Sequence, residues 1–146
     1  MLHPLWANGA PLQPFPHQAQ VWQRAVAAFP QPFLFCDEVG LGKTIEAGLV
    51  LRMLILRDVL KRVLLIAPRS LIRQWMEELR EKFALTAWFF DGHCLRDVDG
   101  HVRRTDPPWE EEGIVIVSRR TSRTHSHKLL NLLIIFSIEH IDLKNN

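Results

Sequence analysis

Apolar side chains recur along this chain at two spacings, one typical of helices and the other of buried strands. Positions at helical spacing run over residues 17–29, 44–60 and 71–83. Between and after them lie short apolar runs of the kind found in parallel sheets, at residues 33–36, 62–67, 87–90 and 113–118. Because strands and helices alternate, we predict an α/β fold with a parallel sheet flanked by helices and joined by right-handed crossovers.

Two of the predicted helices differ in how their apolar positions are distributed. Residues 44–60 are apolar on nearly every side, as expected for a helix packed closely against a sheet, and are broken mainly by Glu46, Arg52 and Arg57. Residues 71–83 are amphipathic. Trp75 lies on the apolar side of that helix, so we expect it in the core rather than as a stacking platform for a base.

Composition divides the chain into three segments. Prolines crowd the first 16 residues and predict an extended lead-in over residues 1–16. Residues 17–118 form the predicted lobe, including a polar segment at 91–113 with two Asp-Gly turns. Residues 119–146 form a tail without glycine or proline, and it begins with ten residues that lack apolar side chains. We interpret the tail either as a strand with a basic lead-in or as poorly ordered residues.

Length and charge limit the class of protein. With 146 residues, of which 47% are hydrophobic and 23% charged, the chain suits one globular domain. The tail carries 5 Lys and Arg against 2 Asp and Glu, whereas residues 1–118 carry 13 against 14. The net charge of +2 therefore arises in the tail, and a uniformly basic coat for nucleic acid is excluded.

The cysteines and the apolar runs bear on the compartment. Cys36 and Cys94 stand alone, which favours a reducing compartment over a disulfide framework or a zinc site. We assign none of the histidines to a metal. The N-terminus lacks the pattern of a signal peptide, and no apolar run approaches the roughly 20 residues that span a bilayer. We therefore expect a cytoplasmic protein without a membrane partner.

A glycine-containing segment between a predicted strand and a predicted helix carries the strongest chemical signal. It reads DEVGLGKT and comprises Asp37, Glu38, Val39, Gly40, Leu41, Gly42, Lys43 and Thr44. Small residues let backbone N–H groups surround phosphates, and the following helix adds the positive end of its dipole. Lys43 would contact the β and γ phosphates of ATP, and the Thr44 hydroxyl would join the shell of Mg²⁺. The alternative is a glycine-rich turn with a chance Lys-Thr, since Asp37 stands where the general GxxxxGK[ST] pattern has glycine.

Four segments together resemble a known family. DEVGLGKT followed by IEAGL resembles motif I of the Swi/Snf-like branch of superfamily 2 helicases, and of RapA-like ATPases in particular. Residues 15–18 (FPHQ) resemble the start of the lobe in that family, and residues 62–79 (RVLLIAPRSLIRQWMEEL) are similar to its motif Ia. Residues 114–118 (IVIVS) are similar to the strand and serine ahead of the next helix that contacts nucleic acid. The resemblance covers residues 14–118 and implies the N-terminal part of the first RecA-like P-loop NTPase lobe.

The resemblance also implies roles for individual residues. Gln18 would hold adenine, residues 37–44 would hold the phosphates of ATP together with Mg²⁺, and the nucleic-acid backbone would lie near Arg69, Ser70 and Arg73. DNA is expected ahead of RNA, and RNA polymerase or a separately encoded second helicase lobe is an expected protein partner. The plainer alternatives are a Gln18 exposed on a helix face and two arginines that are ordinary solvated charges.

The parts that hydrolysis requires are not recognisable in this sequence. ATPases of this family place an acidic pair, the DExH motif, at the end of a later strand, and a second lobe supplies an arginine finger. Here the apolar run at 129–136 is followed by Ser137, Ile138, Glu139 and His140. With His140 aligned to the family histidine, Ser137 and Ile138 stand where the carboxylates belong. We expect a truncated or frameshifted product that does not hydrolyse ATP by itself.

Three functions remain to be compared. The first is the ATP-binding lobe of a helicase or translocase that acts on nucleic acid. The alternative is a non-catalytic nucleotide-binding or interaction module that docks onto a separate second lobe. A small-molecule P-loop kinase is weaker, because no lid-like arginine cluster follows the loop and the likeness to motif Ia would then be coincidence. ATP turnover with and without duplex DNA distinguishes the first two.

Overall fold

The computed structural model describes residues 6–7, 10–11, 16–29, 43–104, 113–124 and 133–136. The chain forms two compact units, one from Met1–Leu60 with Glu78–Leu85 and the other from Lys61–Glu77 with Thr86–Asn146. The predicted strand at residues 33–36 lies outside the described residues.

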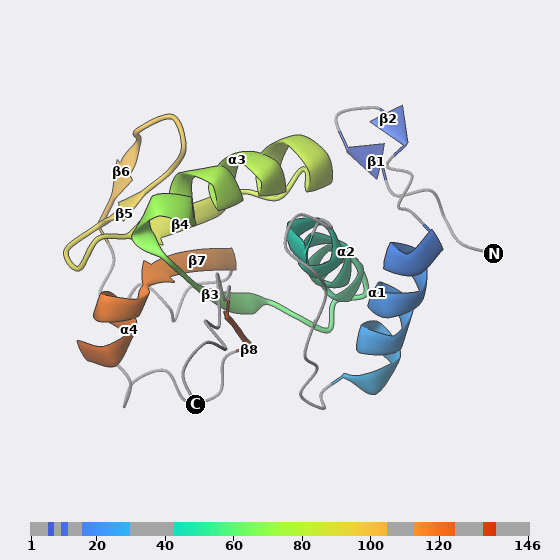
Figure 1. Cartoon of the computed structure of the whole chain (residues 1–146). Coiled ribbons are helices and arrows are strands. Elements are labelled where there is room, and N and C mark those ends of the chain that lie inside the picture. The colour runs from blue at the N-terminus through green and yellow to red at the C-terminus, as the bar shows by residue number, and fades with distance from the viewer. Residues whose placement is uncertain are drawn as a thin grey trace. The chain divides into compact units, whose positions relative to one another are not determined.

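Helices and strands alternate over residues 43–90, as the spacing of apolar positions predicts (Figure 1). The helices are α1 Pro16–Ala28, α2 Lys43–Leu56, α3 Ile72–Phe83 and α4 Arg119–Thr124, with a 3₁₀ turn, η1, at Arg69–Leu71. The strands are β1 Trp6–Ala7, β2 Ala10–Pro11, β3 Arg62–Ala67, β4 Ala87–Phe90, β5 Leu95–Arg96, β6 Val102–Arg103, β7 Gly113–Ser118 and β8 Leu133–Phe136. The predicted α/β class is confirmed.

In the first unit, α1 and α2 pack against each other. α1 buries Trp22, Ala25 and Val26, which stand at helical spacing. In α2 all six residues from Glu46 to Leu51 are buried, and one face of a helix cannot hold six consecutive positions. The stretch from Glu46 to Leu51 is therefore enclosed on every side, as its nearly unbroken apolar sequence predicts.

The end of α2 is set by backbone geometry. The helix ends at Leu56, earlier than the predicted residue 60. Asp58 has a left-handed conformation with φ of 56°, which a helix cannot continue through. The backbone N–H groups of Val59 and Leu60 both donate to the carbonyl of Leu54, at 3.0 and 3.2 Å, and close the turn.

A small antiparallel pair precedes α1. β1 pairs with β2 so that Trp6 lies opposite Pro11 and Ala7 opposite Ala10. The sequence predicts an extended lead-in here, and the two strands are extended. Their pairing depends on a chain reversal that proline spacing does not reveal.

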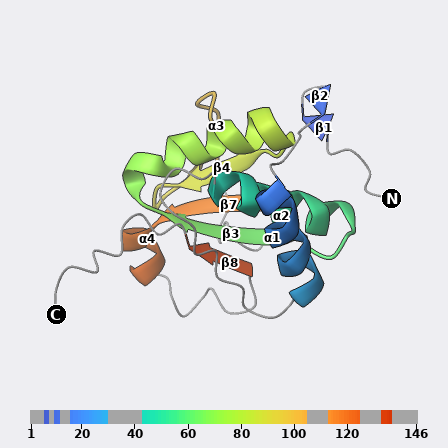
Figure 2. The ribbon, with the colours of Figure 1, turned by 45° about the vertical axis from the view of Figure 1, so that its right-hand side comes forward.

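The second unit is built on a six-stranded sheet in the order β6-β5-β4-β7-β3-β8. Four of its strands, β4, β7, β3 and β8, are parallel to one another. β3 pairs along its whole length with β7, and its other side pairs with β8, which Figure 2 shows beside it. The parallel sheet is thus confirmed, and the strand at 133–136 supports the interpretation that the tail contains one.

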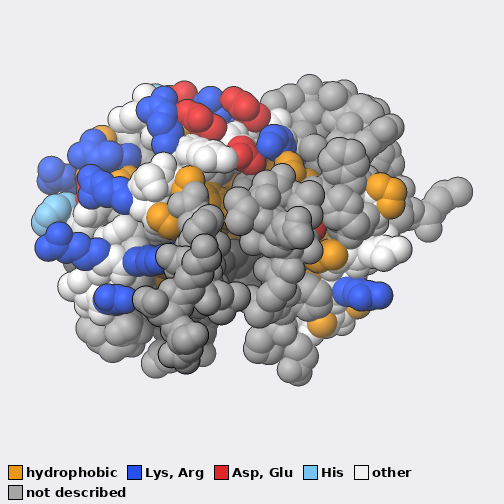
Figure 3. All heavy atoms as spheres, viewed as in Figure 1, with side chains coloured by type: hydrophobic (Ala, Val, Ile, Leu, Met, Phe, Trp, Pro, Cys, Tyr) orange, Lys and Arg blue, Asp and Glu red, His pale blue; other side chains and the backbone are white. Residues whose placement is uncertain are grey.

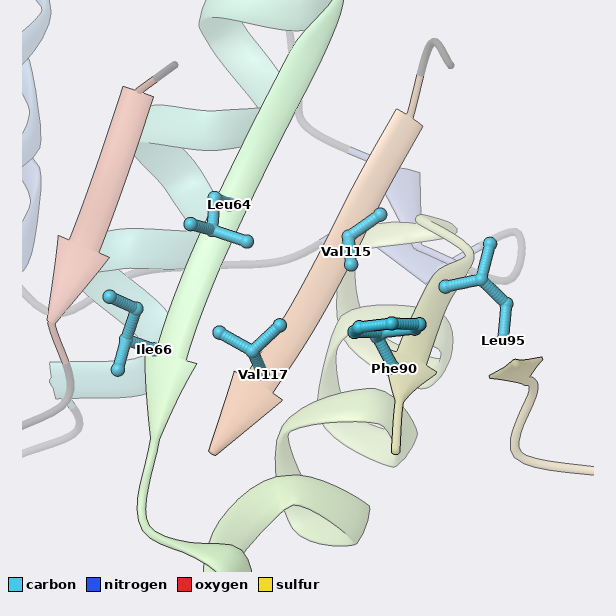
Figure 4. Close-up of a cluster of buried hydrophobic side chains, with 6 residues drawn as sticks. All are labelled: Leu64, Ile66, Phe90, Leu95, Val115 and Val117. Atoms are coloured by element: carbon cyan, nitrogen blue, oxygen red, sulfur yellow. The ribbon is translucent and has the colours of Figure 1, made fainter. Parts of the chain in front are cut away.

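A short hairpin extends the sheet beyond the predicted strands. β5 pairs antiparallel with both β4 and β6, within the segment that the sequence marks only as polar. Gly92 and Gly100, the glycines of the two Asp-Gly turns, have φ of 111° and 90°, a region that glycine adopts without strain. Figure 4 shows the buried cluster of this sheet: Leu64, Ile66, Phe90, Leu95, Val115 and Val117. Two-residue strands are too short to show a period in the sequence, so the hairpin was missed.

α3 is the amphipathic helix that the sequence predicts. It buries Ile72, Trp75, Met76, Leu79 and Phe83, which share one face because they are three or four residues apart. Trp75 is therefore a core residue, as expected. The helix stops where Ala84 turns left-handed, and the N–H of Leu85 donates to the carbonyl of Leu79 at 3.0 Å.

The basic part of the tail, which the sequence predicts only as a lead-in or as poorly ordered residues, begins with a short helix. α4 follows β7 directly, and none of its six described residues is buried. None of the described helices combines the length and the hydrophobicity that a membrane span requires.

Candidate functional site

The carboxyl ends of β3 and β7 lie side by side at one edge of the sheet. Their register places Ala67, the last residue of β3, opposite Ser118, the last residue of β7. Parallel strands deliver the residues that follow them to the same edge, where open α/β sheets bind their ligands. The turns after β3 and β7 therefore emerge together, and α4 contacts both strands.

The turn after β3 carries the three residues predicted to lie near a nucleic-acid backbone. Arg69 and Ser70 are exposed in η1, where the N–H of Leu71 donates to the carbonyl of Pro68 at 2.9 Å. Arg73 lies in the first turn of α3 with its side chain 79% exposed. Its Nε donates to Glu77 Oε1 at 2.8 Å, an exposed pair between residues four apart. The three residues thus lie on η1 and the adjoining first turn of α3, and Arg73 has an acidic partner.

The turn after β7 is held by a serine cap. The N–H of Thr121 donates to Ser118 Oγ at 3.2 Å, and Ser118 Oγ lies 3.0 Å from Thr121 Oγ1. A serine in this place satisfies one of the N–H groups that the first turn of a helix leaves without an internal partner. The hydroxyls of Ser122 and Thr124 donate back to the carbonyls of Arg119 and Arg120. All three hydroxyl-bearing residues of α4 are thus bonded within or next to the helix.

α4 adds three arginines that the sequence analysis did not assign to a site. Arg119, Arg120 and Arg123 are all exposed. Figure 3 shows Lys and Arg side chains gathered on the side of the molecule that carries α4, β5 and β6 in Figure 1. The excess of positive charge in the tail could have pointed to them, because exposed arginines at a sheet edge suit phosphate oxygens.

The predicted nucleotide segment is described only from the point where α2 begins. Asp37, Glu38, Val39, Gly40, Leu41 and Gly42 lie outside the described residues, as do the side chains of Gln18, Lys43 and Thr44. The backbone of α2 starts at Lys43, so Lys43 and Thr44 occupy its first turn. A helix of 14 residues that opens with lysine suits an anion, since its first N–H groups and its dipole favour negative charge. Gln18 lies on α1, which packs against this helix.

Glu46 is an unexpected feature of the same helix. Its side chain is fully buried, and it is the one charged residue in the described part of the chain with that property. Burying a charged carboxylate raises the free energy of the folded state unless nearby groups offset the loss of water, so a buried glutamate usually has a specific structural or functional role. In the sequence, Glu46 shows only as a polar break in an apolar helix. A helix that is apolar on nearly every side has no polar face, so the pattern does not show whether Glu46 is exposed or buried.

Two carboxylates organise the turns on either side of β5. The N–H of Cys94 holds the pKa of Asp91 well below its usual range; partial burial opposes this, and the N–H of His93 and the guanidinium of Arg96 add to the lowering. These contacts make Asp91 the acceptor that fixes the first turn. Cys94 itself is buried and has no disulfide.

The second turn brings Asp97, Asp99 and His101 together, with possible ligand atoms within 4.8 Å of one another. Desolvation would raise the pKa of Asp97, but hydrogen bonds from His101 outweigh it and the pKa lies below its usual value. The same contact, at 2.7 Å, raises the pKa of His101. Because these bonds close the turn by themselves, we assign no metal to the cluster.

Comparison with known proteins relates this arrangement to a family. A family model described as the SNF2-related domain matches residues 20–140. The match extends beyond residue 118, where the resemblance seen in the sequence ends, and includes α4 and β8.

Two individual proteins are also similar to this chain. The uncharacterized ATP-dependent helicase YqhH of Bacillus subtilis is 36% identical over 137 residues, which are 91% of this chain and 22% of that protein. The RNA polymerase-associated protein RapA of Stutzerimonas stutzeri is 35% identical over 115 residues, 78% of this chain and 12% of that one. The chain thus spans less than a quarter of the length of these relatives.

A solved structure shares the fold. The SWI2/SNF2 ATPase core of Sulfolobus solfataricus, in complex with dsDNA, aligns with a TM-score of 0.63 and 20% identity, over 98% of this chain and 35% of that one.

Proposed function

Because the chain belongs to the SNF2-related domain family, we propose that it is the ATP-binding part of the first RecA-like lobe of a helicase or translocase that acts on nucleic acid. The observation that carries this proposal is the shared edge of β3 and β7. Two adjacent parallel strands there end in turns that present Arg69, Ser70 and Arg73 on one side and the arginines of α4 on the other.

ATP and Mg²⁺ are the proposed ligands of the segment that leads into α2. The family implies a nucleotide and a divalent metal. Lys43 would neutralise the terminal phosphates, Thr44 would bind the metal, and the N–H groups from Asp37 to Gly42 would surround the phosphates. Gln18, on the helix that packs against α2, would recognise adenine. When bound, ATP supplies the phosphoanhydride whose hydrolysis drives translocation, and Mg²⁺ offsets its charge.

Nucleic acid is the proposed partner of the arginine edge, with DNA ahead of RNA. Guanidinium groups bind phosphate oxygens in a forked geometry, and such contacts position a protein on a duplex without reading its sequence. The dsDNA bound to the Sulfolobus solfataricus relative favours DNA. Association with RNA polymerase is the corresponding proposal from the RapA relative.

Hydrolysis is proposed to need more than this chain. The residues after β8, in the place of the acidic pair, are Ser137 and Ile138, and neither can bind Mg²⁺ through a carboxylate. This observation also favours a second candidate, a nucleotide-binding or interaction module that does not hydrolyse ATP and docks onto a separate second lobe. Duplex-stimulated ATP turnover by an intact protein that contains this lobe would favour the helicase assignment over that module.

The direct test of the nucleotide site is the variant Lys43→Ala. A ligand present at 100 times its Kd stabilises a protein by about 2.7 kcal/mol, so ATP with Mg²⁺ should raise the melting temperature of the wild-type chain by several degrees. Lys43→Ala should lose that shift, because the charge on the terminal phosphates is no longer neutralised. Lys61→Ala, which removes an exposed lysine next to β3, is the matched control and should keep it. A shift that survives in Lys43→Ala would refute the site.

A further inference from the structure

A close contact joins α2 to the last residue of α3. The ring of Phe83 lies directly over Gly48, so closely that a Cβ at position 48 would stand 2.6 Å or less from three of its ring carbons. Real side chains do not approach so closely. Position 48 therefore requires glycine for as long as the ring of Phe83 stays where it is.

Each partner in this contact belongs to a helix that begins at a proposed ligand site. Gly48 lies five residues after Lys43, the first residue of α2. Phe83 is the last residue of α3, which follows directly on the Arg69–Leu71 turn. α3 is one continuous helix of 12 residues, so a shift at its first turn moves its last residue as well.

The contact is rigid as well as close. Phe83 is 1% exposed, and the neighbouring Leu49 and Leu79 are not exposed at all. Interiors packed to this extent have low compressibility and pass on displacements instead of absorbing them. Glycine brings the ring against the backbone of α2 itself, with no side chain between them to change its rotamer.

We propose that the ring of Phe83 seated on Gly48 couples the proposed ATP site at the start of α2 to the proposed nucleic-acid site at the start of α3. The inference rests on the proposed function and adds a residue pair that carries communication between its two sites. Such coupling is reciprocal, since the factor by which ATP changes the affinity for a duplex equals the factor by which the duplex changes the affinity for ATP. Phe83 is thus a positioning residue and touches neither ligand.

A packing role alone would make a different prediction. If the ring only fills space, its truncation lowers the stability of the chain. The ratio between the duplex affinity with ATP bound and the duplex affinity without ATP then stays unchanged. If it couples the sites, that ratio moves toward one while each ligand still binds by itself. The ratio is therefore the decisive measurement, and stability is measured beside it.

The experiment measures binding of a short fluorescent DNA duplex to the full chain, with and without a non-hydrolysable ATP analogue and Mg²⁺. In the wild type the analogue should change the Kd for the duplex by about fivefold or more. Phe83→Leu should bring the factor close to one. Leu95→Val is the matched control, because it trims a buried residue of the β-sheet cluster and should keep the wild-type factor.

A second pair of variants makes the test specific to this contact. Gly48→Ala alone should also lose the factor, because its methyl group displaces the ring. Gly48→Ala combined with Phe83→Leu should recover part of it, since the smaller side chain leaves room for the methyl group and contacting residues are not additive. The double variant also keeps the test possible if one of the single variants fails to fold.

The possible failures are distinguishable. If the wild type binds no ATP analogue or no duplex, the proposed function fails and the coupling fails with it. If both ligands bind and the analogue does not change the duplex affinity, or if Phe83→Leu keeps the wild-type factor, the coupling is overturned and the proposed function stands. Loss of the factor in Leu95→Val as well as in Phe83→Leu would also overturn it, because general destabilisation would then explain both.

Discussion

The turns after β3 and β7 reach the same edge of one sheet and are held there by different forces. After β3, α3 buries Ile72, Trp75 and Met76 from its first turns onward. After β7, α4 buries none of its six described residues and begins with the capping hydroxyl of Ser118. One arginine-bearing turn is thus anchored by apolar burial, and the other by hydrogen bonds.

The difference has an energetic consequence. Fully burying one large apolar side chain contributes about 1.5–3 kcal/mol, so the position of α3 rests on several such contributions. A helix of six residues is far below the roughly 12–15 at which isolated helices become even marginally stable. The arginines of α4 therefore depend on one cap and on contacts with β7 and β3, whereas Arg69 and Arg73 lie next to a well-anchored helix.

The largest expected effect comes from removing charge on the weakly anchored side. Arg119→Ala combined with Arg120→Ala should weaken binding of a DNA duplex several-fold. It should also lower the slope of log affinity against log salt by about 0.9 for each phosphate that is no longer neutralised. Binding titrations over a range of salt concentrations measure both. Arg24→Ala with Arg57→Ala, which removes two exposed arginines of the other unit, should leave the slope unchanged. Equal slopes for the two double variants would exclude α4 from the interface.

The next effect tests the cap itself. Ser118→Ala should lower the free energy of unfolding by about 1 kcal/mol, because the N–H of Thr121 loses its acceptor, and Ser118→Thr should retain most of it. Denaturant unfolding gives these values. Ser70→Ala, at the corresponding exposed turn after β3, is the matched control and should change stability little. The contrast between the two turns disappears if both alanine variants cost the same.

The smallest effect concerns the ion pair on α3. Glu77→Gln removes the partner of Arg73, and an exposed pair of this spacing contributes only about 0.3–0.5 kcal/mol. We therefore expect a barely measurable loss of stability and a modest gain in duplex affinity, because Arg73 becomes available to phosphate. Gln74→Ala, at an exposed position on the same turn, serves as the control. A loss of duplex affinity in Glu77→Gln would mean that the pair orients Arg73 for binding.

Much of the fold could be predicted because it is written in local periodicity. The strands at 62–67, 87–90 and 113–118 were found with the observed bounds, since each is a continuous apolar run. The β5–β6 hairpin was not, because its strands are two residues long. Periodicity did not reveal α4, because it has no apolar face. Only the likeness of residues 114–118 to a family segment that precedes a helix pointed to it, and it contacts β7 and β3.

The candidate site likewise has one part that the sequence predicts and another that it does not. Arg69, Ser70 and Arg73 could be predicted from their resemblance to a family motif. The structure shows them exposed, on η1 and the first turn of α3, and their role stays a prediction. The arginines of α4 have no such motif, although their charge is visible in the composition of the tail. The segment from Asp37 to Gly42 lies outside the described residues and stays a prediction.

Local order along the chain was sufficient to indicate the α/β class and the membership of a helicase-like family, because spacing and short motifs depend only on near neighbours. The pairing of Ala67 with Ser118, the complete burial of Glu46 and the seat of Phe83 on Gly48 were decided by tertiary structure alone. Each of these features depends on residues that lie far apart in the chain. Long-range register and close packing depend on the whole set of folded contacts, which no window of the sequence contains.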